Sequence, residues 1–196
     1  DEINKNLSNK NFISAEYNLK KILEEDANNL KALFLLGSIF LEIKEFEKSK
    51  KYLNKVIDID PNIANANSNL GVVHINLREF DLAKKYILRA IEINPKHIDA
   101  YNYLGLIYSE LGQFEKGLSS TKKALELNEN YFQGYNNLGL IYKKFNFFND
   151  AEANFKRTIE INSNFTQSYY NLMELYEKAN ENEKLENIIK DFEKIF

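Results

Sequence analysis

The hydrophobic and polar positions of this chain follow a helical spacing that is interrupted at regular intervals. In residues 98–131, apolar side chains spaced three or four residues apart form two successive stripes, and each stripe predicts one amphipathic helix. The first stripe is Tyr101, Leu104, Tyr108 and Leu111, and the second is Phe114, Leu118, Ala124, Leu125 and Leu127. We therefore expect two helices in this stretch, joined by a short turn.

The same pattern returns every 34 residues. Four glycines mark the period (71 − 37 = 34, and likewise onward), each preceded by leucine: Gly37, Gly71, Gly105 and Gly139. Three further columns keep this register: Phe46, Phe80, Phe114 and Phe148; Ser49, Ala83, Gly117 and Ala151; Val56, Ala90, Ala124 and Thr158. The chain is therefore an internal repeat, and each unit contains a pair of helices.

The turn inside each unit falls at a column that favours a left-handed backbone. Gly112, Asn146 and Asn180 stand there in the later units, and these residue types commonly close a helix. Lys44 and Arg78 stand there in the earlier units, so we expect a cap that is not uniform. The column that closes the second helix contains Pro61, Pro95, Glu129 and Ser163.

The glycine column needs a packing reason, because glycine inside a helix is about 0.5–1 kcal/mol less favourable than alanine. A missing side chain lets two helix backbones approach each other closely, while aromatic residues fill the wider gaps nearby. We expect each glycine to mark such a crossing.

This arrangement resembles the tetratricopeptide repeat. The residues that carry the resemblance are Tyr101, Leu104, Gly105, Tyr108, Phe114, Gly117, Ala124 and, from the preceding unit, Pro95. The resemblance implies an all-α fold, an α-solenoid of stacked helix-turn-helix units that forms a right-handed superhelix. It also implies that the first helices line the inner, concave face.

The resemblance covers nearly the whole chain, which we interpret as a single solenoid over residues 1–196. The predicted parts are a partial unit at 1–29, full units at 30–63, 64–97, 98–131 and 132–165, and a divergent terminal unit at 166–196. In the terminal unit Met173, Leu185 and Phe192 stand where small residues belong, so we expect looser packing there. Because residue 1 is Asp rather than Met, we expect a piece of a longer protein or a processed chain.

Two other repeat classes have a similar period. Pentatricopeptide RNA-binding repeats need a basic surface and a 35-residue step, and ankyrin repeats carry a TPLH-like turn in a unit of about 33 residues. The chain shows neither pattern.

The composition of the chain excludes several classes of function. A formal net charge of −3 and a pI near 5.6 argue against a nucleic-acid partner. The chain contains no cysteine, which excludes disulfides, thiolate metal sites and cysteine nucleophiles. The sequence contains neither an apolar run long enough to span a bilayer nor a signal-peptide pattern, so we expect a soluble protein without membrane insertion, most simply cytoplasmic.

Candidate chemistry is sparse. Of the two histidines, His74 stands in the aromatic packing column, where we expect a core residue with a satisfied nitrogen, and His97 follows Pro95 in a turn. Metal sites need several converging ligands, and the sequence places no such group together. It also lacks a glycine-rich phosphate loop and a nucleophile elbow. We expect no catalysis, no cofactor and no metal.

Side chains of the first helices that the packing columns do not use predict the lining of a concave groove. The predicted lining includes Leu106, Ser109, Glu110, Leu140, Lys143, Lys144 and Lys178. The candidate partner-binding residues are Phe34, Asn65, Asn69, Asn102, Tyr103, Asn136, Asn137, Tyr170 and Asn171. Phe34, Tyr103 and Tyr170 are the candidate aromatic anchors, although Phe34 could instead pack on the preceding helix pair. Lys143 and Lys144 end a first helix, where the helix dipole favours cations, and we interpret them as solvated.

One groove column is rich in asparagine: Leu35, Asn69, Tyr103, Asn137 and Asn171. An amide offers both a donor and an acceptor, so such a ladder can hold a peptide backbone. It resembles the asparagine ladder of O-GlcNAc transferase repeat regions, although Leu35 and Tyr103 depart from the pattern and would interrupt the ladder.

Three functions fit this sequence. The first is a protein-interaction scaffold that binds a peptide or an extended protein segment in its groove. The second is self-assembly into a homo-oligomer through the terminal helices, and the third is a substrate-recruiting arm of a larger enzyme such as a glycosyltransferase. The fold alone does not choose among them.

Overall fold

A computed structural model describes residues 11–195, which contain eleven helices and no strand. The chain divides into two compact units, with the division between His97 and Ile98. The predicted all-α repeat array is confirmed. The first ten residues of the predicted partial unit, together with Phe196, lie outside the described residues.

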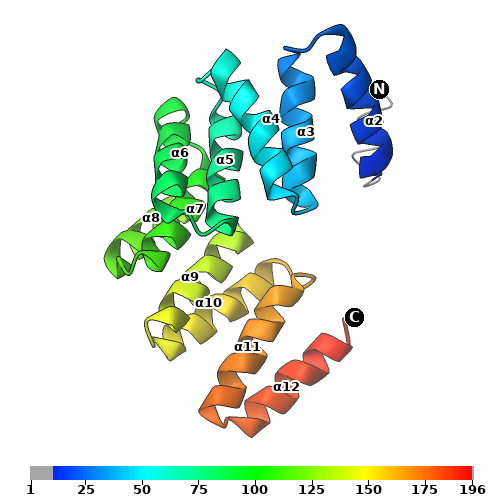
Figure 1. Ribbon diagram of the computed structural model, residues 1–196. Helices are drawn as coiled ribbons and strands as arrows, with labels where there is room; N and C mark the ends of the chain where they lie inside the picture. Colours follow the sequence, from blue (N-terminus) through cyan, green and yellow to red (C-terminus); the bar gives the residue numbers. More distant parts are fainter. Residues whose placement is uncertain (1–10, 196) are drawn as a thin grey trace. The chain divides into compact units, whose positions relative to one another are not determined.

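From residue 11 onward, the first unit has one helix followed by two helical hairpins (Figure 1). Its helices are α2 (Phe12–Glu25), α3 (Leu30–Glu42), α4 (Phe46–Ile59), α5 (Ala64–Asn76) and α6 (Phe80–Ile93). Helix α2 has the register of a second helix, and α3 with α4 and α5 with α6 are complete pairs.

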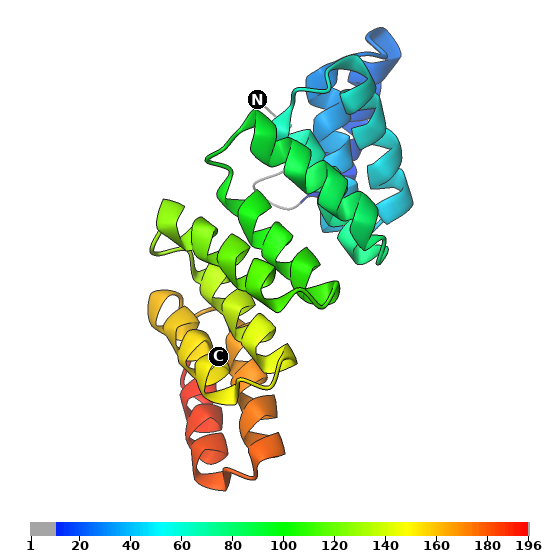
Figure 2. The ribbon, with the colours of Figure 1, turned by 90° about the vertical axis from the view of Figure 1, so that its left-hand side faces the viewer.

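The second unit is built from three hairpins, whose paired helices lie side by side in both ribbon views (Figures 1 and 2). Its helices are α7 (Ile98–Glu110), α8 (Phe114–Leu127), α9 (Phe132–Lys144), α10 (Phe148–Ile161), α11 (Thr166–Ala179) and α12 (Asn182–Glu193). In each pair the first helix also contacts the first or second helix of its neighbour, as the repeat register predicts.

The turn inside each hairpin has one conformation throughout. The left-handed column has φ of 63° at Lys44, 61° at Arg78 and 74° at Gly112, and Asn146 and Asn180 have similar values. In the first hairpin the Glu45 amide donates to the Phe40 carbonyl and the Lys44 amide to Leu41, which is the Schellman pattern, and the same pair of bonds recurs in the other four. The expectation of a non-uniform cap was therefore wrong: the residue type varies, but the backbone does not.

The turns between hairpins are closed by a column that sequence reasoning missed. Asp26, Asp60, Asn94, Asn128 and Asn162 follow the second helices, and each accepts a side-chain hydrogen bond from the amide two residues later, at 2.9–3.1 Å. This local bond stabilises the turn whether or not proline follows. It explains why the later units need no equivalent of Pro61 and Pro95.

Each glycine of the repeat column faces a larger side chain of the paired helix. A Cβ atom added to Gly37 would lie 2.7 Å from Leu53 Cγ, and one added to Gly71 would lie 2.6 Å from Ile87 Cδ1. Gly105 meets Thr121 and Gly139 meets Phe155 in the same way. The four facing residues are themselves spaced by 34 and are fully buried, so the close crossing predicted from the sequence is confirmed.

Two buried polar side chains of the core, His74 and Ser49, have defined partners. His74, which is 4% exposed, contacts Glu79 through Nδ1 at 2.5 Å and stacks on Tyr86. The predicted core histidine is therefore confirmed. Ser49 Oγ donates to the Gly37 carbonyl at 2.7 Å, which uses the space beside the missing side chain.

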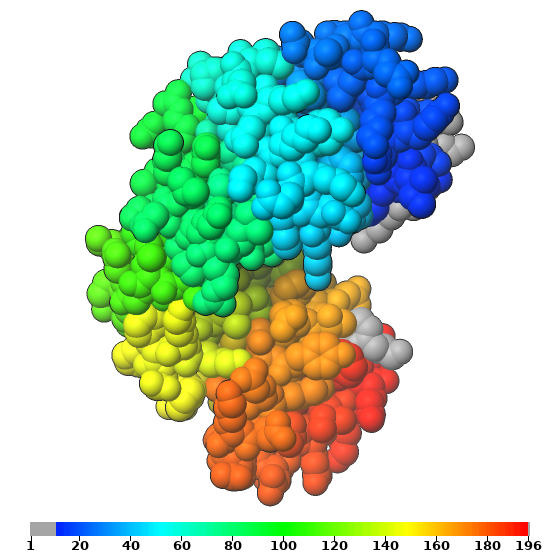
Figure 3. Space-filling view, in the orientation of Figure 1, coloured from blue at the N-terminus to red at the C-terminus, as the bar shows by residue number. Residues whose placement is uncertain are grey.

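The terminal hairpin packs differently from the others. Helix α12 buries no residue, whereas α4, α6, α8 and α10 bury three or four each. Phe192, which replaces a small residue of the repeat, lies with its ring 5.6 Å from Tyr169 and 5.4 Å from Tyr170. In the space-filling view the surfaces of α11 (orange) and α12 (red) meet, but α12 stays at the outside (Figure 3).

The glycine contact predicts a specific coupling in stability. Gly71→Ala places a methyl group against Ile87, and we expect a loss of about 1–3 kcal/mol in the free energy of unfolding from overpacking. In an Ile87→Ala background the space is open, so the same substitution is expected to cost much less. Urea denaturation of the four proteins measures the coupling, and equal costs in both backgrounds would contradict the close crossing.

Candidate functional site

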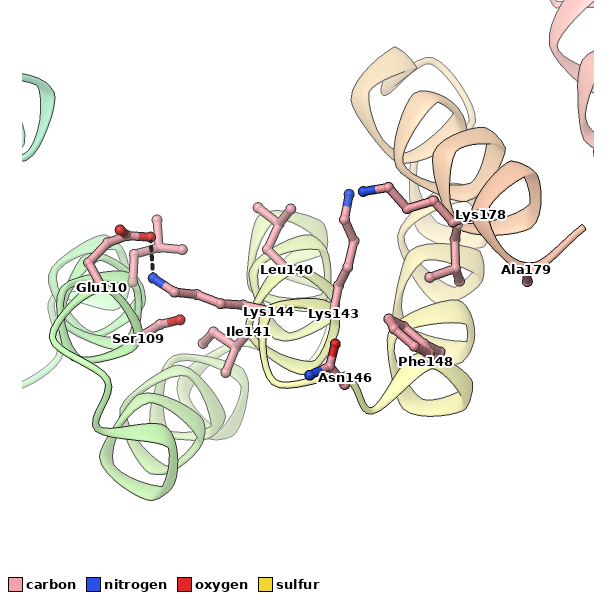
Figure 4. Close-up of a pocket in the computed structure, with 12 residues that line it drawn as sticks. Ser109, Glu110, Leu140, Ile141, Lys143, Lys144, Asn146, Phe148, Lys178 and Ala179 are labelled. Carbon is pink, nitrogen blue, oxygen red and sulfur yellow. Dashed lines mark ion pairs between the residues drawn. The ribbon is translucent and has the colours of Figure 1, made fainter.

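A cavity of about 620 Å³ opens on the second unit, along the C-terminal halves of its first helices (Figure 4). Its apolar wall is formed by Leu106 from α7, Leu140 and Ile141 from α9, and Leu175 from α11. Phe148, the first residue of α10, completes this wall beside Ala179. Three first helices, α7, α9 and α11, therefore contribute to the lining of this cavity.

The repeat register explains which side chains reach the cavity. Leu106 and Leu140 occupy one column, one residue after the repeat glycine. Both are partly buried. Leu140 also packs against the core cluster formed by α10 and α11. Apolar side chains that are left partly open beside charged ones are typical of ligand-binding hollows in folded proteins.

The rim of the cavity is charged. Lys143 at the end of α9 and Lys178 on α11 point toward one another in Figure 4, and each Nζ lies 2.7 Å from an oxygen of Glu174. Lys144 lies 2.9 Å from Glu110. Three ammonium groups thus face two carboxylates, and the rim has a positive excess in a chain whose formal net charge is −3.

The two lysines change the pKa of the Glu174 carboxyl. Hydrogen bonds from Lys143 and then Lys178 hold its pKa below the ordinary value for glutamate. The Lys143 side chain is only 20% exposed, so the sequence-based interpretation of a solvated lysine was wrong for this residue. It bridges two neighbouring first helices.

Four of the nine residues predicted for the groove are buried, namely Asn102, Asn136, Asn137 and Asn171. Asn136 Oδ1 accepts from Ser168 Oγ at 3.0 Å and from Asn171 Nδ2 at 3.1 Å, which joins α9 to α11. Asn102 Nδ2 donates to the Tyr131 hydroxyl at 3.3 Å. The structure therefore brings Asn136 and Asn171 together in a contact between repeats.

The other five predicted residues are more accessible. Asn65 is exposed and Tyr170 is 52% exposed, while Phe34, Asn69 and Tyr103 are partly buried. Asn69 Nδ2 donates to Ser38 Oγ at 3.1 Å, and Phe34 packs against the core of the first unit. Burial raises the pKa of Tyr103.

None of these nine residues lines the cavity, which lies about one helical turn further along the first helices. Seven residues that do line it are among the other groove positions predicted from the first helices: Leu106, Ser109, Glu110, Leu140, Lys143, Lys144 and Lys178. Sequence reasoning missed the remaining lining residues, which are Ile141, Asn146, Phe148, Leu175 and Ala179.

Other chemistry is limited in the described part of the chain. Within residues 11–195, His, Cys, Asp and Glu side chains form no group of three or more with the geometry to hold a metal ion. None of the helices in this range combines the length and the apolar character that a bilayer crossing requires.

Comparison with protein families identifies the class. The tetratricopeptide repeat family model matches residues 30–63, 64–97 and 132–165, more than half of the chain, and a second model of the same repeat matches residues 86–118. The chain belongs to the tetratricopeptide repeat (TPR) family. Membership in this family indicates a protein–protein interaction scaffold. No curated protein sequence matches the chain.

Solved structures support the same fold. A crystal structure of MamA is 27% identical, with a TM-score of 0.69, and the match covers 85% of this chain and 98% of MamA. PilW, described as a widely conserved type IV pilus biogenesis factor, has a TM-score of 0.84 at 16% identity, covering 95% of this chain and 86% of PilW. YrrB, described as a TPR protein with an unusual peptide-binding site, has a TM-score of 0.60 at 20% identity, with coverage of 89% and 90%.

The lysine pair around Glu174 predicts a pH dependence. The folded state lowers the pKa of the Glu174 carboxyl, so the ionised carboxylate stabilises the folded protein at pH values above the ordinary glutamate pKa. This contribution to the free energy of unfolding is lost as the pH falls through the pKa that Glu174 has in the folded state. Wild type is therefore expected to lose more stability than Glu174→Gln between about pH 7 and about pH 3 in urea denaturation.

Glu177→Gln, on the same helix, serves as the matched control and is expected to follow the wild-type curve. If Glu174→Gln lost as much stability on acidification as wild type, the two lysines would not be stabilising the ionised carboxylate.

Proposed function

We propose that this chain is a non-catalytic scaffold that binds an extended segment of a protein partner. The observation that supports this proposal is the cavity along α7, α9 and α11, which combines an apolar wall with a charged rim. A groove that is already formed on rigid helices loses little conformational entropy on binding, which favours the capture of a flexible segment. The peptide-binding site named for YrrB shows that another TPR protein binds peptides.

The residues predicted from sequence belong to this proposal in two roles. Of the accessible ones, Tyr103 on α7 and Tyr170 on α11 are proposed to contact the partner beside the cavity. Asn65 and Asn69 lie on α5 of the other unit and are proposed as a separate contact surface. The buried amides are proposed to act through position, because Asn136 and Asn171 fix neighbouring first helices against each other. Replacing a buried amide would therefore change both stability and binding.

Peptides selected from a random display library on the full chain test the groove. Bound peptide is expected to slow hydrogen exchange at the C-terminal halves of α7, α9 and α11. Leu140→Ala is expected to weaken binding about tenfold, because it removes apolar contact area from the wall.

Leu82→Ala is the matched control, since Leu82 is an exposed leucine of α6 that does not line the cavity. It should leave the affinity unchanged. Protection confined to α8, α10 or α12, or equal affinities of the two variants, would contradict groove binding.

A second candidate function is self-assembly through α2. Ile13 is 84% exposed and Tyr17 is 63% exposed. The matching columns in later units are polar or small and exposed: Glu47, Asp81, Glu115, Asn149 and Glu183; Lys51, Lys85, Ser119, Ala153 and Asn187. Stacking of further hairpins leaves these positions uncovered, and we propose that a second copy of this chain buries the apolar pair.

Sedimentation velocity over about 1–100 µM tests this second candidate, because reversible association changes the mass with concentration. A mass that rises with concentration is expected, together with a shift toward monomer in Ile13→Ala combined with Tyr17→Ala. Lys51→Ala with Lys85→Ala controls for the outer face in general. A monomer at every concentration would end the self-assembly candidate.

A further inference from the structure

One column of the repeat breaks at the edge of the cavity. The residue just before the left-handed turn is Ile43, Leu77, Leu111 and Phe145 in the first four hairpins, and Ala179 in the last. Alanine is the smallest member of this column and ends α11. The side chain that the register supplies elsewhere is therefore missing at this position.

The missing side chain leaves Phe148, the first residue of α10, more exposed than the equivalent phenylalanines of the other hairpins. In the third hairpin Phe114 is partly buried, with its ring 4.7 Å from Phe145 and 5.0 Å from Phe147 of the next hairpin. The equivalent neighbours of Phe148 are Ala179 and Glu181. Phe148 is 50% exposed, although Phe46, Phe80 and Phe114 are all partly buried.

Phe148 and Ala179 both line the cavity (Figure 4), and Leu140 and Leu175 add to its apolar lining. An aromatic ring that is half exposed in a hollow of this kind offers an apolar side chain a large contact area. The repeat itself indicates the size of the missing group, because leucine or phenylalanine occupies this position in other hairpins.

The charge beside this space is also specific. Lys143 and Lys178 share the single carboxylate of Glu174, and the Lys178 side chain is 69% exposed. A second carboxylate can be held by the same two ammonium groups without displacing Glu174. An acidic group is thus favoured next to the apolar space, and a basic group is disfavoured.

We propose that the Phe148–Ala179 pocket takes a large apolar side chain of the partner segment, Leu, Ile, Met or Phe, and that Lys143 and Lys178 bind a neighbouring Asp or Glu of the same segment. This inference rests on the proposed function, because it assigns the chemistry of the segment held in the groove. A protein segment is favoured over a small molecule because the cavity extends from here to Leu106 on α7, across three first helices.

Random peptides of about twelve residues, displayed and selected on the full chain, test the assignment. We expect enriched peptides to carry Leu, Ile, Met or Phe next to Asp or Glu. Ala179→Leu fills the space and is expected to weaken their binding at least about tenfold, while raising the melting temperature by covering Phe148. Lys143→Gln with Lys178→Gln is expected to weaken binding similarly and to reduce its dependence on salt.

Matched variants on the outer face control for the substitutions themselves. Ala153→Leu makes the same change at an exposed alanine of α10, and Lys123→Gln removes an ion-paired lysine of α8. Both should bind the selected peptides as wild type does.

Other outcomes separate this inference from the function on which it rests. Peptides that bind the groove without the apolar–acidic pair, or that bind Ala179→Leu as tightly as wild type, overturn the inference and leave the groove function standing. A library that yields no groove-binding peptide overturns both. Octanoate has an apolar chain and a carboxylate, so octanoate that displaces the peptides at equal affinity overturns the assignment to a protein segment.

Discussion

Contact between a glycine of one helix and a large side chain of its hairpin partner underlies the rest of this structure. Leu53, Ile87, Thr121 and Phe155 differ widely in volume, yet each lies where a Cβ on the opposite glycine would collide with it. The constraint is therefore the absence of a side chain on the first helix rather than the identity of the partner. Because this crossing repeats every 34 residues, each hairpin presents equivalent surfaces to its neighbours.

The repeated packing also determines which polar groups remain for function. Amides that face neighbouring first helices bond to each other, as Asn136 does with Ser168 and Asn171. Lysines at the helix ends pair with acids of the next hairpin, as Lys143 does with Glu174. A binding surface is left where the register breaks, and Ala179 is the clearest such break beside the cavity.

Most of the fold could be predicted from the sequence, because periodicity reports directly on helix pairing. The glycine column, the hairpin pairing and the core position of His74 all followed from spacing and residue type. The uniform turn did not, since Lys44 and Arg78 adopt a left-handed backbone that their residue types disfavour. The surrounding Schellman bonds impose it.

The candidate site was harder to predict, for a physical reason. The position of a residue in the repeat indicates whether its side chain faces the groove. Its burial also depends on the residue at the neighbouring position of the next repeat. Asn136 and Asn171 occupy groove columns, but they contact each other and are buried. The apolar space beside Phe148, moreover, exists because position 179 has alanine where other hairpins have a large side chain. Ala179 is visible in the sequence only when its column is compared with Phe145 and the other members.

Native-state hydrogen exchange tests most directly whether the glycine crossing holds the hairpins together. In α5 and α6 the crossing is intact, whereas Met173 replaces the glycine in the last hairpin and α12 buries no residue. The amides of α12 should therefore exchange through a local opening at a clearly lower free energy than those of α6 and α10. If α12 were as strongly protected as α10, the glycine contact would not be what stabilises each pair.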